Sequence, residues 1–400
     1  MPNALSSSHH SSLRERIETS LYRDLLAPWF PACVDPSGGF HQRFGADWSR
    51  LEDESRFIVF QSRMTWVSAV VAEAGRREFA DHARHGVRIL LDEMQDPETG
   101  AFRWFTRDGQ GEGERHAYGQ SFAIYGLAAA ARALESEEAL AGAKRAFAWL
   151  ERAHYDPEHG GYFEAATPAG ETIRTKEGLD GIGTPYGQKS QNTHLHLLEA
   201  FAEFYRVWPD PLLRRRLEEM LQVFNERLFV QEGWLHGFVQ AGWTPVPGTV
   251  SHGHDVEAAH LMLDAADALG KRDDPTTLDR AVRLVDYALR VGWDQEGGGF
   301  FYAGTPEGEL LDHTKNWWVQ AEGLLALATL ADRTNDARYT EALRKQWEWI
   351  ETHQVDEAYG GWHESVDLLG EPQGLDLKGH AWKAAYHDGR GLLYTARLLR

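Results

Sequence analysis

A short acidic, glycine-rich phrase that ends in an aromatic residue recurs along the chain, and it constrains the fold more than any other feature. It is written VDPSGGF at residue 34, QDPETGAF at 95, YDPEHGGY at 155, WDQEGGGF at 293 and VDEAYGGW at 355, with a weaker VQEGW at 230. Successive copies close 60 to 72 residues apart, on Phe40, Phe102, Tyr162, Trp234, Phe300 and Trp362. A repeat of this length is typical of architectures assembled from similar structural units.

Each interval between two phrases contains two segments with helical apolar spacing. The segments AYGQSFAIYGLAAAARAL and EEALAGAKRAFAWLERA, for example, are rich in alanine and place apolar residues three and four apart. One more helix is expected before the first phrase, at about 12–32, and one after the last, at about 379–399. Because the chain begins and ends with half a pair, the pattern predicts a closed all-α (α/α)6 barrel of twelve helices. The alternative is an open α-solenoid.

The bulk properties narrow the class of protein. The 400 residues contain no Pro/Gly/Ser-rich linker, so we expect one catalytic domain over 12–400 after a disordered tail over 1–11. A formal charge of −20 disfavours nucleic acid and anionic membrane as partners, and no apolar run is long enough to span a bilayer. The single cysteine, Cys33, rules out an intrachain disulfide and favours a reducing compartment. We expect a cytoplasmic monomer or homodimer.

Unusual polar and aromatic residues gather on the even-numbered helices, whereas the odd-numbered helices have the charged face of amphipathic surface helices. If the even-numbered helices form the inner ring, their early turns meet at one end of the barrel, and the glycine-rich phrases surround that same mouth. The clusters comprise Arg63 and Trp66; His116, Tyr118 and Gln120; Asn192, His194 and His196; His254 and Glu257; Trp317, Trp318 and Glu322; and Trp382, Lys383, His387 and Arg390.

Two of these clusters pair an imidazole with a carboxylate at helical spacing. His254 and Glu257 are three residues apart, as are His196 and Glu199, so each pair shares a helix face. A carboxylate beside a histidine orients the ring and raises its basicity. Arg63 is costly to bury unless it is paired, and a bound anionic intermediate is a reasonable partner for it.

No metal or cofactor is expected. Zinc sites need three or more protein ligands at fixed spacing, and the helical H-E-x-x-H motif is absent from the sequence. A metal held jointly by His196, His254 and His387 is the less favoured alternative.

The residues leave three functions open. Two histidines with an arginine suit proton transfer next to a carbonyl group, in which a base removes a C–H proton and a cation stabilises the enediolate. A glycoside hydrolase would need two carboxylates, for which Glu257 and Glu322 are candidates. A carbohydrate-binding barrel without catalysis would need the aromatic residues but no paired histidine and glutamate.

Five segments resemble motifs of the N-acylglucosamine 2-epimerase superfamily, nearest to its cellobiose 2-epimerase and mannose 2-epimerase branch. They are RHAYGQSFAIYGL, NTHLHLLEA, SHGHDVEAA, NWWVQAE and WKAAYHDGR, and they follow one another in order over nearly the whole chain. The last motif departs from the cellobiose branch, which usually has Cys-Pro where this chain has Ala384 and Ala385. The resemblance implies an (α/α)6 barrel and a sugar isomerase without metal or cofactor.

The resemblance also implies roles for individual residues. His254 and His387 resemble the family's acid/base pair on opposite faces of the sugar C2, and Glu257 resembles the carboxylate that supports His254. Arg63 resembles an arginine near the sugar oxygens. His196 resembles a third imidazole that is linked to ring opening. The predicted substrate contacts are Tyr118, Asn192, Trp318, Glu322 and Trp382.

Together these observations predict a 2-epimerase that acts on the reducing-end aldose of mannose, glucose or a cellobiose-type disaccharide through an enediolate. An aldose–ketose isomerase that uses the same residues is the nearer alternative, and an (α/α)6 glycoside hydrolase is the more remote one.

Overall fold

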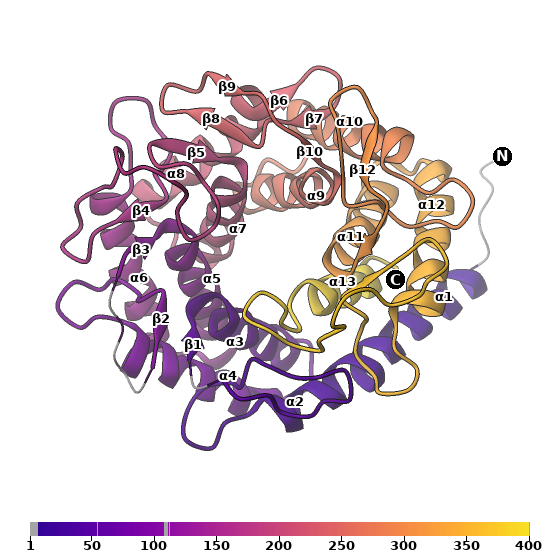
Figure 1. Cartoon of the computed structure of the whole chain (residues 1–400), viewed down its shortest axis with the longest axis horizontal. Coiled ribbons are helices and arrows are strands. Elements are labelled where there is room, and N and C mark those ends of the chain that lie inside the picture. The colour runs from indigo at the N-terminus through magenta and orange to yellow at the C-terminus, as the bar shows by residue number, and fades with distance from the viewer. Residues whose placement is uncertain (1–6, 54, 108–110, 112, 400) are drawn as a thin grey trace.

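Helices alternate between an outer and an inner ring in the computed structural model, which describes residues 7–53, 55–107, 111 and 113–399 (Figure 1). The outer ring contains α1 (Ser7–Thr19), which continues through the π-helical η1 (Ser20–Leu26) into α2 (Ala27–Cys33), α4 (Phe79–Ile89) with η2 (Leu90–Met94), α6 (Glu137–Ala153), α8 (Pro211–Gln222) with η3 (Val223–Leu228), α10 (Pro275–Val291), and α12 (Ala337–Trp349) with η4 (Ile350–Gln354). The inner ring contains α3 (Ile58–Glu73), α5 (Ala117–Leu134), α7 (Gln191–Val207), α9 (His252–Ala268), α11 (Trp317–Thr334) and α13 (His387–Leu398).

The inner ring is closed. Each inner helix packs against the next, and α13 packs against α3, while the outer helix α1 with η1 covers α13. The first helix of the chain therefore completes the outer ring beside the last helix, as Figure 1 shows. The (α/α)6 barrel is confirmed, and the open solenoid is excluded. The inner helices are the ones expected to be even-numbered; they carry odd labels here because α1, η1 and α2 together form the first expected helix.

The two rings differ in how their side chains are buried. In α3 every residue from Ile58 to Ala72 is buried, because an inner helix meets protein on all sides. Outer helices are amphipathic: on α10, buried positions such as Leu284 and Tyr287 alternate with solvated charges at helical spacing. This contrast is the physical basis on which the sequence separates inner from outer helices.

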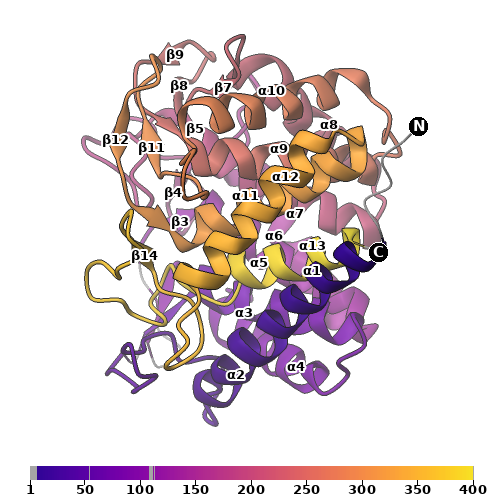
Figure 2. The ribbon, with the colours of Figure 1, turned by 90° about the vertical axis from the view of Figure 1, so that its right-hand side faces the viewer.

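Short antiparallel strands join the loops at one end of the barrel, the left-hand side of Figure 2. They are β1 (Arg56–Phe57), β2 (Phe105–Thr106), β3 (Arg115–His116), β4 (Ala165–Ala166), β5 (Gln188–Ser190), β6 (Phe229–Val230), β7 (Trp234–Leu235), β8 (Phe238–Gln240), β9 (Pro245–Val246), β10 (Val250–Ser251), β11 (Ala303–Gly304), β12 (Leu310–Asp312), β13 (Lys315–Asn316) and β14 (Ser365–Val366). The strand before one inner helix pairs with a strand in the loop before the next: β1 with β2, β3 with β4, β5 with β8, β10 with β11 and β13 with β14. A bridge between Phe44 and Gly379 joins the first such loop to the last and completes the ring.

The recurring phrase forms a tight turn that the following inner helix holds in place. Five inner helices contribute their fourth residue to this contact, which we call the clasp: Gln61, Gln120, His194, Asp255 and Gln320. Each glutamine accepts from the backbone N–H of the residue that closes the phrase and donates to the carbonyl of the same residue. His194 and Asp255 each accept from one N–H. In the last repeat, Lys383 donates to the carbonyl of Trp362.

One closing residue differs from the prediction. In the fourth phrase the clasp from Asp255 holds the N–H of Leu235, whose side chain is buried, rather than that of Trp234, which is half-buried. The bridge that joins Val34 to Phe40 in the first phrase joins Phe229 to Leu235 here, so a leucine occupies the position equivalent to Phe40.

Both chain ends also depart from the expected boundaries. Helix α1 begins at Ser7, within the tail expected over 1–11, of which residues 1–6 lie outside the described residues. Leu13 and Ile17 anchor this helix in the core, and the polar residues before them extend it. The last helix begins at His387 instead of about 379, because a bridge between His380 and Lys383 folds the preceding segment into a turn. Within the described residues, every helix is too short or too polar to cross a bilayer.

Candidate active site

A cavity of about 250 Å³ opens at the mouth of the barrel, and all six inner helices contribute to it. Its lining is Arg63, Tyr118, Ile182, Asn192, His196, His254, Glu257, Tyr302, Trp317, Trp318, Trp382 and His387. Nine of the ten site residues predicted from the sequence are among them. The tenth, Glu322, is fully buried and contacts Nδ1 of His387, which lines the cavity.

The side chains meet because they occupy equivalent positions on their helices. Arg63, His196, Glu257 and Glu322 are each the sixth residue of an inner helix. The clasps align the starts of these helices, and each residue adds 1.5 Å of rise, so sixth residues lie at one depth below the mouth. The layer above contains Tyr118, Asn192, His254 and Trp318, and the layer three residues deeper contains Glu199 and His260.

His387 is held by a carboxylate on the neighbouring helix. Its Nδ1 lies 2.6 Å from Oε1 of Glu322, and its ring is 6% exposed. Burial lowers the pKa of His387 to about 3, although the contact with Glu322 acts in the opposite direction. The imidazole is therefore neutral near pH 7, and its Nε2 is left for the cavity.

Arg390 connects three carboxylates beneath the cavity. Its guanidinium donates to Glu199, Glu257 and Glu322, with 2.7 Å to Glu322 Oε1. Burial opposes ionisation of Glu322, but Arg390 and two histidine donors outweigh it and hold the pKa of Glu322 well below its ordinary value. Burial and the Glu322 charge raise the pKa of Glu257 well above its ordinary value. Glu322 is thus the ionised member of this pair and Glu257 the neutral acid.

His196 is oriented in a similar way on the other side of Arg390. Its Nδ1 lies 2.6 Å from Oε1 of Glu199, as the spacing predicted, and Glu199 Oε2 accepts from the hydroxyl of Tyr386 at 2.6 Å. Arg390 and His196 outweigh the effect of burial and lower the pKa of Glu199 to about 2. A continuous network therefore joins His196 to His387 through Glu199, Arg390 and Glu322.

The environment of His254 differs from the prediction. Glu257 contacts Arg390 instead of His254, and within the described residues neither ring nitrogen of His254 has a hydrogen-bond partner. A hydrogen bond from the buried guanidinium of Arg390 holds the Glu257 carboxyl instead. His254 instead packs on the indole of Trp318, with ring centres 4.9 Å apart, and that indole also contacts His387 at 5.7 Å. Burial lowers the pKa of His254 to about 3.

Arg63 faces the cavity without a carboxylate partner among the described residues. Its Nη1 donates to the carbonyl of Trp382 at 2.7 Å, and its guanidinium lies over the rings of Phe122 and Tyr386, 4.5 and 4.9 Å from their centres. Its Nε is buried and has no partner within the described residues. A buried cation in this state suits a ligand that develops negative charge.

In the part of the chain that the structure describes, two groups of side chains have the donor types of a metal site, but each already contacts a cationic side chain of the protein. Glu257, Glu322 and His387 converge, and Arg390 donates to both carboxylates. Asp356, His363 and Asp376 form the second group, and the ammonium of Lys378 binds Asp356. A divalent ion at either place would meet a positive charge, so these residues do not fit a metal site.

Comparison with known proteins agrees with the resemblance in the motifs. A family model described as N-acylglucosamine 2-epimerase (GlcNAc 2-epimerase) matches residues 38–388. This chain belongs to the N-acylglucosamine 2-epimerase family. The predicted family is therefore confirmed over nearly the whole barrel.

Relatives within the family include two kinds of enzyme. The chain is 30% identical over 384 residues to a cellobiose 2-epimerase of Bacteroides fragilis, with 94% of this chain and 97% of the relative covered. It is 27% identical over 381 residues to a D-mannose isomerase of Marinomonas mediterranea, with 90% and 92% covered. The solved structure of cellobiose 2-epimerase from Spirochaeta thermophila superimposes with a TM-score of 0.90 at 27% identity, covering 100% of this chain and 99% of that one.

Sequence reasoning missed or undervalued several residues of this family member's site. Arg390 and Glu199 each stand three residues after a site histidine, and His260 stands three residues after Glu257, so helical spacing offered a signal for all of them. Ile182 and Tyr302 come from loops before α7 and α11, where periodicity gives no signal. Trp382 lines the cavity as predicted, but from the turn before α13 instead of from the helix.

Proposed function

We propose that this protein is a sugar 2-epimerase that moves the proton at C2 of a reducing-end aldose through an enediolate. The observation that carries the proposal is a neutral His387, oriented by an ionised Glu322, in a cavity that also contains His254 and Arg63. Among the described residues, Arg63 has no carboxylate partner. Membership of the family and the cellobiose 2-epimerase relatives support the same activity. The substrate class is a small sugar with a free reducing end.

The proposed reaction uses each group for a property that the structure gives it. After ring opening, one neutral imidazole, His387 or His254, removes the C2 proton as general base. Arg63 stabilises the charge that develops on the enediolate oxygens. While the enediolate is bound, the other histidine takes up a proton from water, delivers it to the opposite face of C2 and returns to its neutral form. The first histidine releases the proton it removed to water. The negative intermediate favours the imidazolium form of its neighbours, which offsets the burial that otherwise keeps both rings neutral.

His196 and Glu257 have supporting roles in the proposal. His196, fixed by Glu199, is placed to act on the ring oxygens during opening. Glu257 is neutral, and its Oε2 has no partner within the described residues, so it is available to bind a sugar hydroxyl. Tyr118, Asn192, Trp318 and Trp382 provide the walls against which the sugar packs.

Aldose–ketose isomerisation is the second candidate, because D-mannose isomerases are also among the relatives of the chain. The same groups would perform it if the enediolate received its proton at C1. A glycoside hydrolase fits the geometry less well. Oxygens of Glu257 and Glu322 lie within 4.8 Å of one another, and both accept from Nη2 of Arg390. Glu322 does not line the cavity, so the pair leaves no space for a glycosidic bond.

Proton NMR in D2O tests the proposal. The purified, EDTA-treated protein is incubated separately with mannose, glucose, fructose, cellobiose and N-acetylglucosamine. We expect deuterium at C2 together with the C2 epimer of at least one aldose. A ketose product would select the isomerase, and cleavage of cellobiose without exchange at C2 would contradict both candidates.

A further inference from the structure

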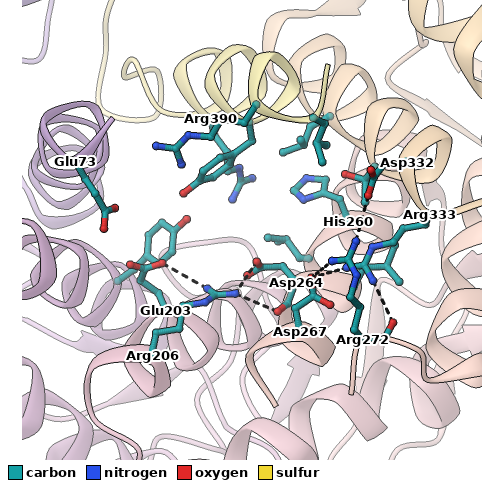
Figure 3. Close-up of a pocket in the computed structure, with 18 of the residues that line it drawn as sticks. Glu73, Glu203, Arg206, His260, Asp264, Asp267, Arg272, Asp332, Arg333 and Arg390 are labelled. Carbon is teal, nitrogen blue, oxygen red and sulfur yellow. Dashed lines mark hydrogen bonds and ion pairs between the residues drawn. The ribbon is translucent and has the colours of Figure 1, made fainter. Parts of the chain in front are cut away.

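A second cavity, of about 530 Å³, lies at the end of the barrel opposite the mouth, where the inner helices end (Figure 3). We call it the far chamber. Its charged residues largely neutralise one another: the ion pairs are Arg132 with Glu73 and Glu203, Arg206 with Glu203 and Asp264, Arg272 with Asp267 and Asp332, and Arg333 with Asp267. This lining therefore gives little reason to expect a charged ligand.

Two residues in the lining of the far chamber contact the catalytic network: Arg390, which has been described above, and His260. His260, on α9, lines the chamber and is 5% exposed. Its Nε2 lies 2.6 Å from Oε2 of Glu322, the same carboxylate whose Oε1 contacts Nδ1 of His387 at 2.6 Å. The side chain of Glu322 therefore connects His260, in the lining of the far chamber, with the ring of His387.

The charge of Glu322 fixes the protonation of both rings. An ionised carboxylate can only accept hydrogen bonds, so His260 must donate from Nε2–H and His387 from Nδ1–H. This tautomer of His387 leaves the lone pair on Nε2, which is the form that a general base needs. His260 and Arg390 together satisfy the remaining lone pairs of Glu322 and fix the plane of its carboxylate.

We propose that His260 is a positioning residue for His387, that it acts through Glu322, and that it is accessible from the far chamber. The expected effect on turnover rests on the proposed function, whereas the expected effect on the tautomer of His387 does not. Without the donor at His260, Glu322 becomes a stronger base and His387 holds a proton more tightly. The His387 base is then protonated at a higher pH, and the carboxylate is free to rotate.

Two substitutions at one position separate positioning from packing. His260→Gln keeps an N–H donor toward Glu322, whereas His260→Leu keeps volume but removes the donor. For His260→Leu we expect kcat to fall about 10- to 100-fold with KM within about twofold, the usual scale for a group that orients a catalytic residue. The acid limb of the kcat/KM profile should move to higher pH. His260→Gln should retain most of kcat, and the control Thr329→Val, also in the chamber lining, should match wild type.

Nitrogen-15 NMR of histidine-labelled full-length protein gives a readout without any sugar. We expect wild type and His260→Gln to show the Nδ1–H tautomer of His387, and His260→Leu to show a raised His387 pKa. An unchanged His387 signal and pH profile in folded His260→Leu would overturn the proposal. If wild type itself exchanged no C2 proton, the proposed function would fail while this NMR comparison would still decide the positioning role.

Imidazole tests access from the far chamber. In His260→Ala the missing ring leaves a hole that is continuous with the chamber, so added imidazole should restore part of kcat in a saturable manner. Wild type and Thr329→Val should not respond. Failure of imidazole to restore activity to a folded His260→Ala that has lost kcat would contradict access by this route.

Discussion

At the scale of residues, the two candidate acid/base histidines are buried alike but supported differently. His387 has a carboxylate partner that fixes its tautomer, whereas His254 is oriented by contact with the indole of Trp318. The same indole contacts both rings, so it sets their mutual orientation. Because the two rings are supported differently, we expect substitution of each histidine to reveal a different role.

Replacement of either histidine should stop epimerisation without stopping all exchange. His387→Asn and His254→Asn should each lower turnover by ~100-fold or more, the usual loss for a positioned acid or base. Each variant should still exchange the C2 proton of the epimer that presents it to the remaining ring, as read by NMR in D2O. The exposed His313→Asn is the control. Full epimerisation by either variant would remove that histidine from the mechanism.

At the scale of elements, the clasp explains why a loop-rich mouth is compatible with a precise site. Gln320 both accepts from and donates to Phe300, and the amide of Gln346 in turn donates to Gln320. These backbone groups are fully buried, so an unmet donor or acceptor there costs about 1–3 kcal/mol. The clasp therefore fixes where each inner helix begins.

Loss of a glutamine clasp should be costly. Gln320→Leu leaves both the N–H and the C=O of Phe300 without a partner, so the free energy of unfolding should fall by about 2–5 kcal/mol. Urea denaturation followed by circular dichroism measures the change. Gln222→Leu, at an exposed position on α8, should lie within about 0.5 kcal/mol of wild type. Equal stability of the two variants would contradict the structural role of the clasp.

The acidic clasp predicts a pH-dependent difference in stability. Burial raises the pKa of Asp255 well above its ordinary value of 3.8. The unfolded chain therefore releases this proton first, so the contribution of Asp255 is greatest below pH 3.8 and is lost as the pH rises toward the folded-state pKa. Asp255→Asn keeps an oxygen for the N–H of Leu235 and removes the titration.

The Asp255→Asn variant is thus expected to gain stability relative to wild type as the pH rises from 5 to 8, by up to about 1.4 kcal/mol per pH unit. Urea unfolding of this variant and of wild type at several pH values measures the slope. A difference that stays constant over the range would show that the carboxyl is ionised in the folded protein.

The helices and loops also differ in how well the sequence alone predicts them. The repeat and the contrast between charged and uncharged helix faces were sufficient for the ring, because both follow directly from burial. Site residues such as His196 and Glu322 could be named because they lie on helices whose spacing is regular. The bond between Arg390 and Glu257 could not be predicted, since it joins helices 133 residues apart in the chain. Nor could Ile182, whose position depends on the path of a loop.

At the scale of the whole molecule, closure of the ring depends on the N-terminal helix. Leu21 is fully buried where η1 meets α13. Leu21→Ala should lower the free energy of unfolding by about 2–5 kcal/mol, and the barrel should still unfold in one step. Circular dichroism and tryptophan fluorescence should give one shared midpoint in urea, and exposed Glu15→Ala on the same helix should resemble wild type. Separate midpoints would indicate the stepwise unfolding of an open array of repeats.

The clasps also make the position of each inner helix independent of the loop segment that precedes it. The residue that closes a phrase and the residue that clasps it are 18 to 32 positions apart, and the intervening segments contribute Ile182, Tyr302 and Trp382 to the cavity. Because each helix start is fixed independently of the segment before it, these segments can lengthen or exchange without shifting the layer that contains Arg63, His196 and Glu257. The mouth segments can therefore vary in length and sequence while the cavity residues on the inner helices, among them Tyr118, Asn192 and Trp318, stay in place.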